Sequence, residues 1–220
     1  VSEAFVLLIG RCPGTSEGAV GGWAGAQMYE SIAQFSDAAR FYESYGRHFR
    51  EAEKAHEATY NAVLLRMTAN DNDEAIVVGR YYLERYPRHE NADDVYFFIG
   101  RAHEGNEDWS EAADTYREYV RRTRDQDRKV EAQTRLAQVL ARGGDERASA
   151  AALEQAVRTA RRQRRRLTGP GLYYGAQARY LQGDAVLTEY AGIEIAGPSE
   201  GLRQRLQRKS ELLQRAALIY

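Results

Sequence analysis

The four histidines are the side chains in this sequence best suited to holding a metal ion. They are His48, His56, His89 and His103. His48 and His56 are eight residues apart, whereas two ligands on one helix face need a spacing of three or four. No His-Glu-x-x-His motif occurs, and Cys12 is the only cysteine, which excludes an intrachain disulfide and a thiolate zinc site. We therefore expect no metal ion and no cofactor, and histidines that are packed or solvated.

Hydroxyl and carboxylate side chains are abundant, but we expect no catalytic residues among them. A nucleophile elbow of the Gly-x-Ser-x-Gly type is not expected. The glycine-rich stretch Gly14–Gly25 lacks the Gly-Lys-Ser/Thr of a phosphate-binding loop. We interpret it as a flexible entry segment or a poorly packed first helix. The sequence thus predicts a protein that is not an enzyme and has no small-molecule substrate.

One run of arginines concentrates positive charge in a chain whose formal net charge is only -1. Its members are Arg158, Arg161, Arg162, Arg164, Arg165 and Arg166. Such a run can bind nucleic acid, acidic lipid or an acidic protein. The alternative, which we favour, is a solvated helix end, where positive charge suits the helix dipole. No aromatic residue interleaves the run, so nucleic acid is the less expected partner and an acidic protein the more expected one.

The elements that carry these residues repeat with a fixed period. The small residues Ala38, Ala75, Ala112 and Ser149 are spaced by 37 residues, since 75 − 38, 112 − 75 and 149 − 112 are all 37. A column of Trp23, Tyr60, Phe97 and Thr134 keeps the same spacing. Each unit reads as two amphipathic helices, and the third is the clearest, with helices expected over 92–103 and 110–122. Gly100 and Ala112 are expected where these two helices cross closely. The fold class is therefore all-α, an array of helical hairpins.

The third unit resembles a tetratricopeptide repeat. The resemblance rests on Tyr96–His103 followed by Trp109, Ala112, Tyr116 and Tyr119, and it extends over roughly Gly22 to Arg158. It implies a right-handed α-solenoid that binds a protein or peptide without catalysis. The linker Tyr86–Asn91 is similar to those of bacterial cell-envelope members, namely the lipoprotein of the β-barrel assembly machinery and the periplasmic Tol-Pal coordinator. The tail resembles extensions in envelope or gliding-motility repeat proteins of myxobacteria. These likenesses imply a periplasmic or outer-membrane-associated protein of a Gram-negative bacterium, with the cytoplasm as the alternative.

The resemblance also implies a binding groove, because the first helices of successive repeats line the concave face in this family. The residues expected there are Trp23, Gln27, Tyr60, Leu64, Phe97, Arg101 and Glu104. The alternative is that the aromatic column packs between helices as core. Family members that clamp a C-terminal carboxylate use a Lys/Asn set, and these positions carry Gln27, Leu64, Arg101 and Gln138 here. We therefore do not expect a carboxylate clamp.

We expect three parts along the chain. Residues 1–21 are an irregular entry segment or the remnant of a preceding repeat, 22–168 form about four repeats, and 169–220 form a C-terminal helical extension. In the extension, a break at Gly169–Gly171 precedes a helix from about Leu172, and a last helix starts near Leu202. This last helix is amphipathic, with Leu206, Leu213 and Tyr220 on one apolar stripe. The extension is expected to cover the apolar face of the fourth repeat.

The sequence does not determine the compartment to which the protein is targeted. The longest apolar run, Ala4–Gly10, is too short to span a bilayer. Val6–Cys12 resembles a bacterial lipoprotein signal only loosely, because Arg11 stands where a small residue is needed. The chain begins at Val1 and ends inside an expected helix, so we expect a piece of a longer protein whose targeting sequence lies elsewhere.

Overall fold

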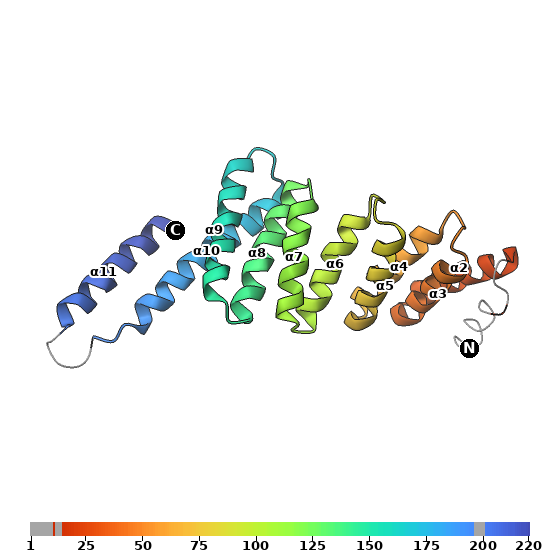
Figure 1. Ribbon diagram of the computed structural model, residues 1–220, viewed down its shortest axis with the longest axis horizontal. Coiled ribbons are helices and arrows are strands. Elements are labelled where there is room, and N and C mark those ends of the chain that lie inside the picture. Colours follow the sequence, from red (N-terminus) through yellow and green to blue (C-terminus); the bar gives the residue numbers. More distant parts are fainter. Residues whose placement is uncertain (1–10, 12–14, 196–200) are drawn as a thin grey trace. The chain divides into compact units, whose positions relative to one another are not determined.

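The computed structural model describes Arg11, residues 15–195 and residues 201–220, and within them it contains ten α-helices and no strand (Figure 1). Eight of the helices form four consecutive hairpins. Their bounds are α2 Ser16–Ser31 with α3 Phe35–His48, α4 Ala55–Thr68 with α5 Asn72–Arg85, α6 Ala92–Gly105 with α7 Trp109–Arg122, and α8 Gln126–Arg142 with α9 Glu146–Gln163. The second helices start at residues 35, 72, 109 and 146, so each start lies 37 residues after the last. The predicted period and the all-α solenoid fold are confirmed.

The turn inside each hairpin has the same unusual backbone conformation. Ala33, Asn70 and Glu107 have positive φ angles of 58°, 59° and 62°, and Gly144 has a φ of 84°. These positions are again 37 residues apart, since each lies two residues before the start of the second helix. A left-handed residue lets the chain reverse within three residues, but it brings the Cβ atom of any residue other than glycine close to the backbone. Only the fourth turn uses glycine there.

By its internal contacts the chain divides into two compact units, residues 1–119 and 120–220. In the first unit the predicted small residues Ala38, Ala75 and Ala112 are at most 1% exposed. They lie on the second helices, where the first helix of the same hairpin packs. Their small size therefore sets how closely the two helices of a hairpin approach.

A tyrosine on the second helix is bound to a glutamate on the first helix in two of the hairpins of this unit. The Tyr42 hydroxyl donates to Glu30 Oε2 over 3.2 Å. The Tyr116 hydroxyl donates to Glu104 Oε2 over 2.8 Å. Both pairs join residues 12 apart at the same place in the repeat. Burial, reinforced by the charge of Glu30, raises the pKa of Tyr42 to about 12.

The second hairpin has Gly79 where the other two have this tyrosine, and the following helix fills the space. A Cβ atom on Gly79 would lie 2.8 Å from Cγ1 of Ile99, on α6. In the first hairpin the large residue is instead on the second helix. Tyr42 belongs to the same core cluster as Ala62, and Ala62 lies 37 residues before Ile99, at the same repeat position. In these two hairpins a large residue on one helix is thus matched by a small residue on the next.

Two other glycines mark close approaches in the first unit. A Cβ atom on Gly100 would lie 2.9 Å from the Tyr116 ring, so the expected close approach at Gly100 is made by this tyrosine rather than by Ala112. A Cβ atom on Gly46 would collide with the hydroxyl of Thr59, on α4. The glycines therefore make room for side chains of the neighbouring helix.

The second unit contains α8 and α9, followed by α10 Gly169–Gly192 and α11 Leu202–Ile219. α10 packs on both α8 and α9, and its buried Gly175 lies against Ala160 of α9. Thr168 anchors its start, because the Thr168 amide and hydroxyl donate to the Asp127 carboxylate over 2.9 and 2.5 Å. The helix was predicted from Leu172 but begins at Gly169, since Pro170 is well tolerated in a first helical turn.

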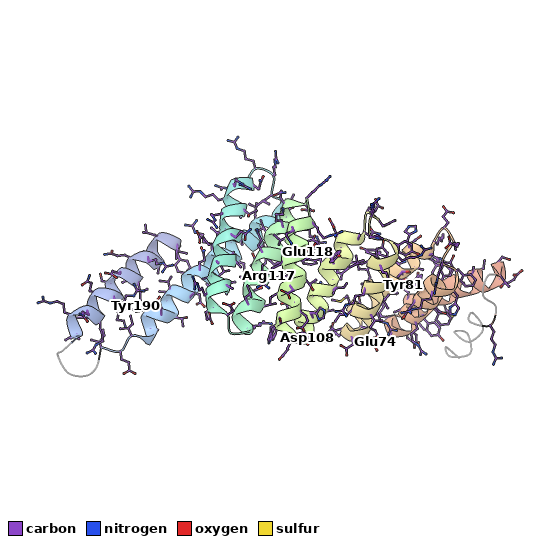
Figure 2. All side chains as sticks on the ribbon, viewed as in Figure 1. Glu74, Tyr81, Asp108, Arg117, Glu118 and Tyr190 are labelled. Carbon is purple, nitrogen blue, oxygen red and sulfur yellow. The ribbon has the colours of Figure 1, made fainter. Side chains whose placement is uncertain are left out.

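α11 lies against the second half of α10. The Arg208 guanidinium reaches Glu189 at 2.6 Å, and the Lys209 ammonium lies 4.3 Å from the centre of the Tyr190 ring (Figure 2). The buried residues of α11 are Leu212 and Ala216. The predicted stripe of Leu206, Leu213 and Tyr220 is instead 47–59% exposed. The prediction chose the wrong face, because the amphipathic helix has apolar residues on two adjoining stripes.

The expected entry segment is corrected in part. α2 begins at Ser16, where the Thr15 hydroxyl caps it by accepting from the Gly18 amide. Residues 16–21 are therefore helical. Residues 1–10 and Cys12, which carry the apolar run and most of the loose lipoprotein-like pattern, lie outside the described residues.

Candidate protein-binding site

The aromatic column on the first helices packs onto the second helix of its own hairpin. The Trp23 ring makes edge contacts with Tyr42 and Tyr45 at centroid distances of 5.2 and 5.7 Å. The Phe97 ring lies 5.3 Å from Tyr119 and is only 2% exposed. Phe97 is therefore a core residue and is removed from the predicted groove. Its burial follows from its position, which faces the crossing of α6 and α7.

Trp23 and Tyr60 are half-buried and keep one edge at the surface. The Tyr60 ring lies 6.2 Å from Tyr82 and 6.4 Å from Phe98. The Lys54 ammonium lies 4.5 Å from the centre of the Trp23 ring, within the range of a cation–π contact. These two aromatic residues thus combine a packing role with a partly accessible surface.

The residues four positions after this aromatic column on the same helices are more accessible to solvent. Gln27 on α2 and Arg101 on α6 are exposed, and Leu64 on α4 is half-buried between them in register. These three residues occupy one repeat position on three successive first helices, and we call them the first-helix face. Glu104 belongs to the same predicted set, but it is half-buried and accepts the Tyr116 hydroxyl. Glu104 therefore has a structural role, whether or not it also contacts a partner.

The arginine run lies at the end of α9 and in the turn after it. All of its members are exposed, and Arg158 pairs with Glu154 at 3.4 Å. Arg161, Arg162, Arg164, Arg165 and Arg166 form no ion pair with any residue that the structure describes. α9 ends at Gln163, so Arg164, Arg165 and Arg166 follow the helix.

The histidines take part in packing and hydrogen bonds. His103 is buried and its Nδ1 lies 3.1 Å from Asp108 Oδ2. His89 Nδ1 lies 2.8 Å from the Tyr82 hydroxyl, and the His56 and His89 rings are 4.4 Å apart. In the described part of the chain, no three His, Cys, Asp or Glu side chains gather as they would around a metal ion. In the same part, no helix combines the length and the hydropathy needed to cross a membrane.

One motif was overlooked in the sequence. Residues 14–18 have the sequence Gly-Thr-Ser-Glu-Gly, which matches the Gly-x-Ser-x-Gly pattern. The expectation that the sequence lacks this pattern is therefore wrong. Ser16 opens α2 at the surface, and its hydroxyl donates to Glu17 Oε2 over 3.0 Å. A nucleophile elbow needs a strand before the serine and a histidine beside it. The described residues contain no strand. His48 lines the same hollow as Ser16, but its Nδ1 contacts the Ser44 carbonyl, and the Ser16 hydroxyl is bonded to Glu17 instead.

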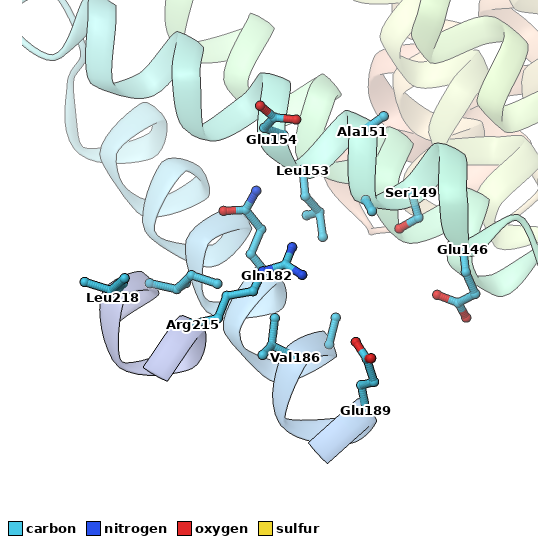
Figure 3. A pocket seen from close by; sticks show the side chains of 13 residues that line it. Glu146, Ser149, Ala151, Leu153, Glu154, Gln182, Val186, Glu189, Arg215 and Leu218 are labelled. Atoms are coloured by element: carbon cyan, nitrogen blue, oxygen red, sulfur yellow. The ribbon is translucent and has the colours of Figure 1, made fainter. Parts of the chain in front are cut away.

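A cleft in the second unit was not anticipated. It lies between α9, α10 and α11 and has a volume of about 640 Å³ (Figure 3). Leu153 and Val186 face it, and charged side chains stand around it. α10 and α11 depart from the 37-residue repeat, so no spacing in the sequence pointed to this cleft.

Comparison with known proteins agrees with this architecture. The model of the family described as YfiO, outer membrane lipoprotein, matches residues 24–155. Two crystal structures of a putative kinesin light chain from Podosopora anserina, with nearly identical tetratricopeptide-like repeats, are similar in fold. One of them is 14% identical over 88% of this chain and 90% of that chain, with a TM-score of 0.55. The other is 13% identical over 86% and 92%, with a TM-score of 0.54. No curated protein matches the sequence.

The structural similarity shows the fold, and the family match covers more than half of the chain. The protein is an array of tetratricopeptide-like repeats, and its family indicates a non-enzymatic interaction scaffold. The chain belongs to the YfiO family of outer membrane lipoproteins.

Proposed function

We propose that the protein holds a peptide, loop or helix of a partner protein along its first-helix face, as part of a larger assembly in the bacterial envelope. The observation that carries this proposal is the alignment of Gln27, Leu64 and Arg101 at one repeat position on α2, α4 and α6. Their helices are already formed and packed, so little ordering cost falls on the protein when a partner binds. The family match supports an envelope location, and we infer the periplasmic side of the outer membrane.

The chemistry of this face suits an extended segment with one apolar side chain. Arg101 can donate to a carboxylate or a carbonyl, Gln27 can both donate and accept, and Leu64 offers apolar contact between them. Arginine is also a residue type that often dominates binding energy at interfaces.

Site-specific photo-crosslinking tests this proposal. A photoreactive amino acid is placed at Gln27, Leu64 or Arg101, and the protein is expressed in the envelope of a Gram-negative host. The matched controls place it at Val77 or Arg80, which are exposed on α5, a second helix. We expect discrete protein adducts from the first-helix positions and none from the controls. Adducts of equal strength from both sets, or from α5 alone, would refute the proposal.

The arginine run supports a second candidate function. Residues 155–183 contain seven arginines and no Asp or Glu, and most of the run is exposed without an ion pair among the described residues. An acidic protein, an acidic lipid or nucleic acid would bind such a surface with strongly salt-dependent affinity. Replacing Arg161, Arg162, Arg164, Arg165 and Arg166 with Gln should abolish that binding and leave first-helix crosslinks unchanged. Unaltered binding of all three ligand types would exclude the run as a site.

A further inference from the structure

The cleft in the second unit has an apolar lining, of which Leu153 and Val186 are only 6% and 5% exposed. Leu153 of α9 and Val186 of α10 line it together with Leu218 of α11. Leu218 is 82% exposed, so its side chain has little contact with the rest of the protein. A second hollow of about 520 Å³ shares Leu218, Ile219 and Gln182 with the cleft and continues it past Val157. The two hollows therefore form one groove along α9.

The charges along this groove are sorted by sign. Glu146 of α9 and Glu189 of α10 stand at one end of the cleft, as Figure 3 shows. Arg215 of α11 and Glu154 of α9 lie on the other side, and Glu154 is paired with Arg158 at 3.4 Å. The continuation of the groove brings in Arg161 and Arg179 and contains no acidic residue. One end thus carries only acidic groups, whereas at the other end arginines outnumber the single, paired glutamate.

Several of these charged groups are available to a ligand. Glu146, Arg161 and Arg215 are exposed and form no ion pair with a residue in the described part of the chain. Glu189 is held in place by Arg208 at 2.6 Å. Arg179 is oriented by the carbonyl of Ile219, to which its Nε donates. Fixed and unpaired charges flank an apolar lining, as in grooves that accept an amphipathic helix.

We propose that this groove binds an amphipathic helix of a partner protein that carries basic residues at one end and acidic residues at the other. The distance along α9 from Glu146 to Arg161 is 15 residues, or about 22 Å at 1.5 Å per residue. A partner helix of about four turns spans it. Its apolar stripe packs on Leu218 and on the exposed Ala151 and Ala185, and its basic end meets Glu146 and Glu189.

Charge complementarity favours such a partner over α2 of a second copy. Among the repeat helices, α2 is the one that exposes two large apolar residues, Val20 and Met28. α2 contains Glu17 and Glu30 but no basic residue. It therefore cannot satisfy the acidic end of the groove. This site lies in the second unit, and its proposal is independent of the one for the first-helix face.

The test uses the full chain and three fluorescein-labelled peptides of about 15 residues with the same leucine stripe. The first peptide has lysines at one end and glutamates at the other, the second has lysines at both ends, and the third has glutamates at both ends. Fluorescence anisotropy at low salt measures the dissociation constants. We expect the mixed-charge peptide to bind tightest, by about tenfold over the other two.

Charge-reversal variants separate recognition from loss of folding. Arg161→Glu with Arg215→Glu should weaken the mixed-charge peptide about tenfold and strengthen the all-lysine peptide. Glu146→Lys should instead strengthen the all-glutamate peptide. Arg203→Glu, exposed on α11 and not lining the groove, is the matched control and should change nothing. Circular dichroism verifies the fold of each variant.

Two sets of results would overturn the inference. Equal binding of the three peptides, or no binding of any below about 1 mM, shows that the groove does not select charge. A concentration-dependent dimer by light scattering that the reversals abolish makes a second copy the occupant. Arg101→Glu should leave peptide binding unchanged, so a failure of the first-helix proposal remains distinguishable from a failure of this one.

Discussion

The left-handed turn residues give the sharpest stability prediction. Glu107 adopts a φ of 62° at the position where the fourth hairpin has Gly144. A residue with a Cβ atom in this conformation costs about 1–2 kcal/mol, whereas glycine loses about 0.5–1 kcal/mol more backbone entropy on folding. The difference predicts that Glu107→Gly stabilises the protein by about 0.5–1 kcal/mol. Glu107 is exposed and has no side-chain hydrogen bond or ion pair with a described residue, so the substitution removes no such contact.

Urea denaturation followed by circular dichroism at 222 nm measures this effect. Ala33→Gly should behave in the same way, and the double variant should be additive at about 1–2 kcal/mol because the two turns are in different hairpins. Asn70→Gly serves as a control with a smaller effect, since asparagine tolerates the left-handed region. Gly144→Ala should destabilise. If Glu107→Gly lowers stability, or Gly144→Ala leaves it unchanged, the argument from backbone strain fails.

Three further predictions concern the first unit. Tyr116→Phe should cost about 1–2 kcal/mol in urea denaturation, because it removes the 2.8 Å bond to the Glu104 carboxylate, and an unchanged midpoint would contradict this. Gly46→Ala should lower stability by about 1–3 kcal/mol through the collision described above. Gly21→Ala, with no atom near the added Cβ, should instead raise it by about 0.5–1 kcal/mol, and equal effects would refute the packing argument. Because the pKa of Tyr42 is raised to about 12 in the folded state, stability should fall as the pH rises from about 10 through 12. Burial also raises the pKa of Tyr82 and Tyr45. The late-titrating absorbance at 295 nm should therefore fall by the share of one tyrosine in Tyr42→Phe.

The repeat period made most of the fold predictable. Ala38, Ala75 and Ala112 fixed the register of the second helices, and the helices of the third hairpin were predicted to within two residues. The period constrains every unit simultaneously, so local ambiguity in one is resolved by the others. In the tail no second unit supplied this check, and α11 was assigned the wrong packing face.

The candidate binding residues were less predictable for a geometric reason. Neighbouring positions on one helix differ by about 100°, so a small error in helix rotation exchanges a core residue for a surface residue. Phe97 was assigned to the groove but is buried against Tyr119. Gln27 and Arg101 were assigned correctly to the surface, because a polar residue at a position between two apolar columns is rarely buried. Whether they contact a partner stays a prediction.

The exchange of Tyr42 and Ala62 for Gly79 and Ile99 has a consequence for how this array can evolve. The unit carrying Gly79 is followed by Ile99, whereas the units carrying Tyr42 and Tyr116 are followed by Ala62 and Leu136 at the same repeat position. Placing a successor with a small residue at that position after the Gly79 unit would leave a void. The place of this unit in the array is therefore constrained by the unit that follows it, and viable recombination breakpoints should keep the two together.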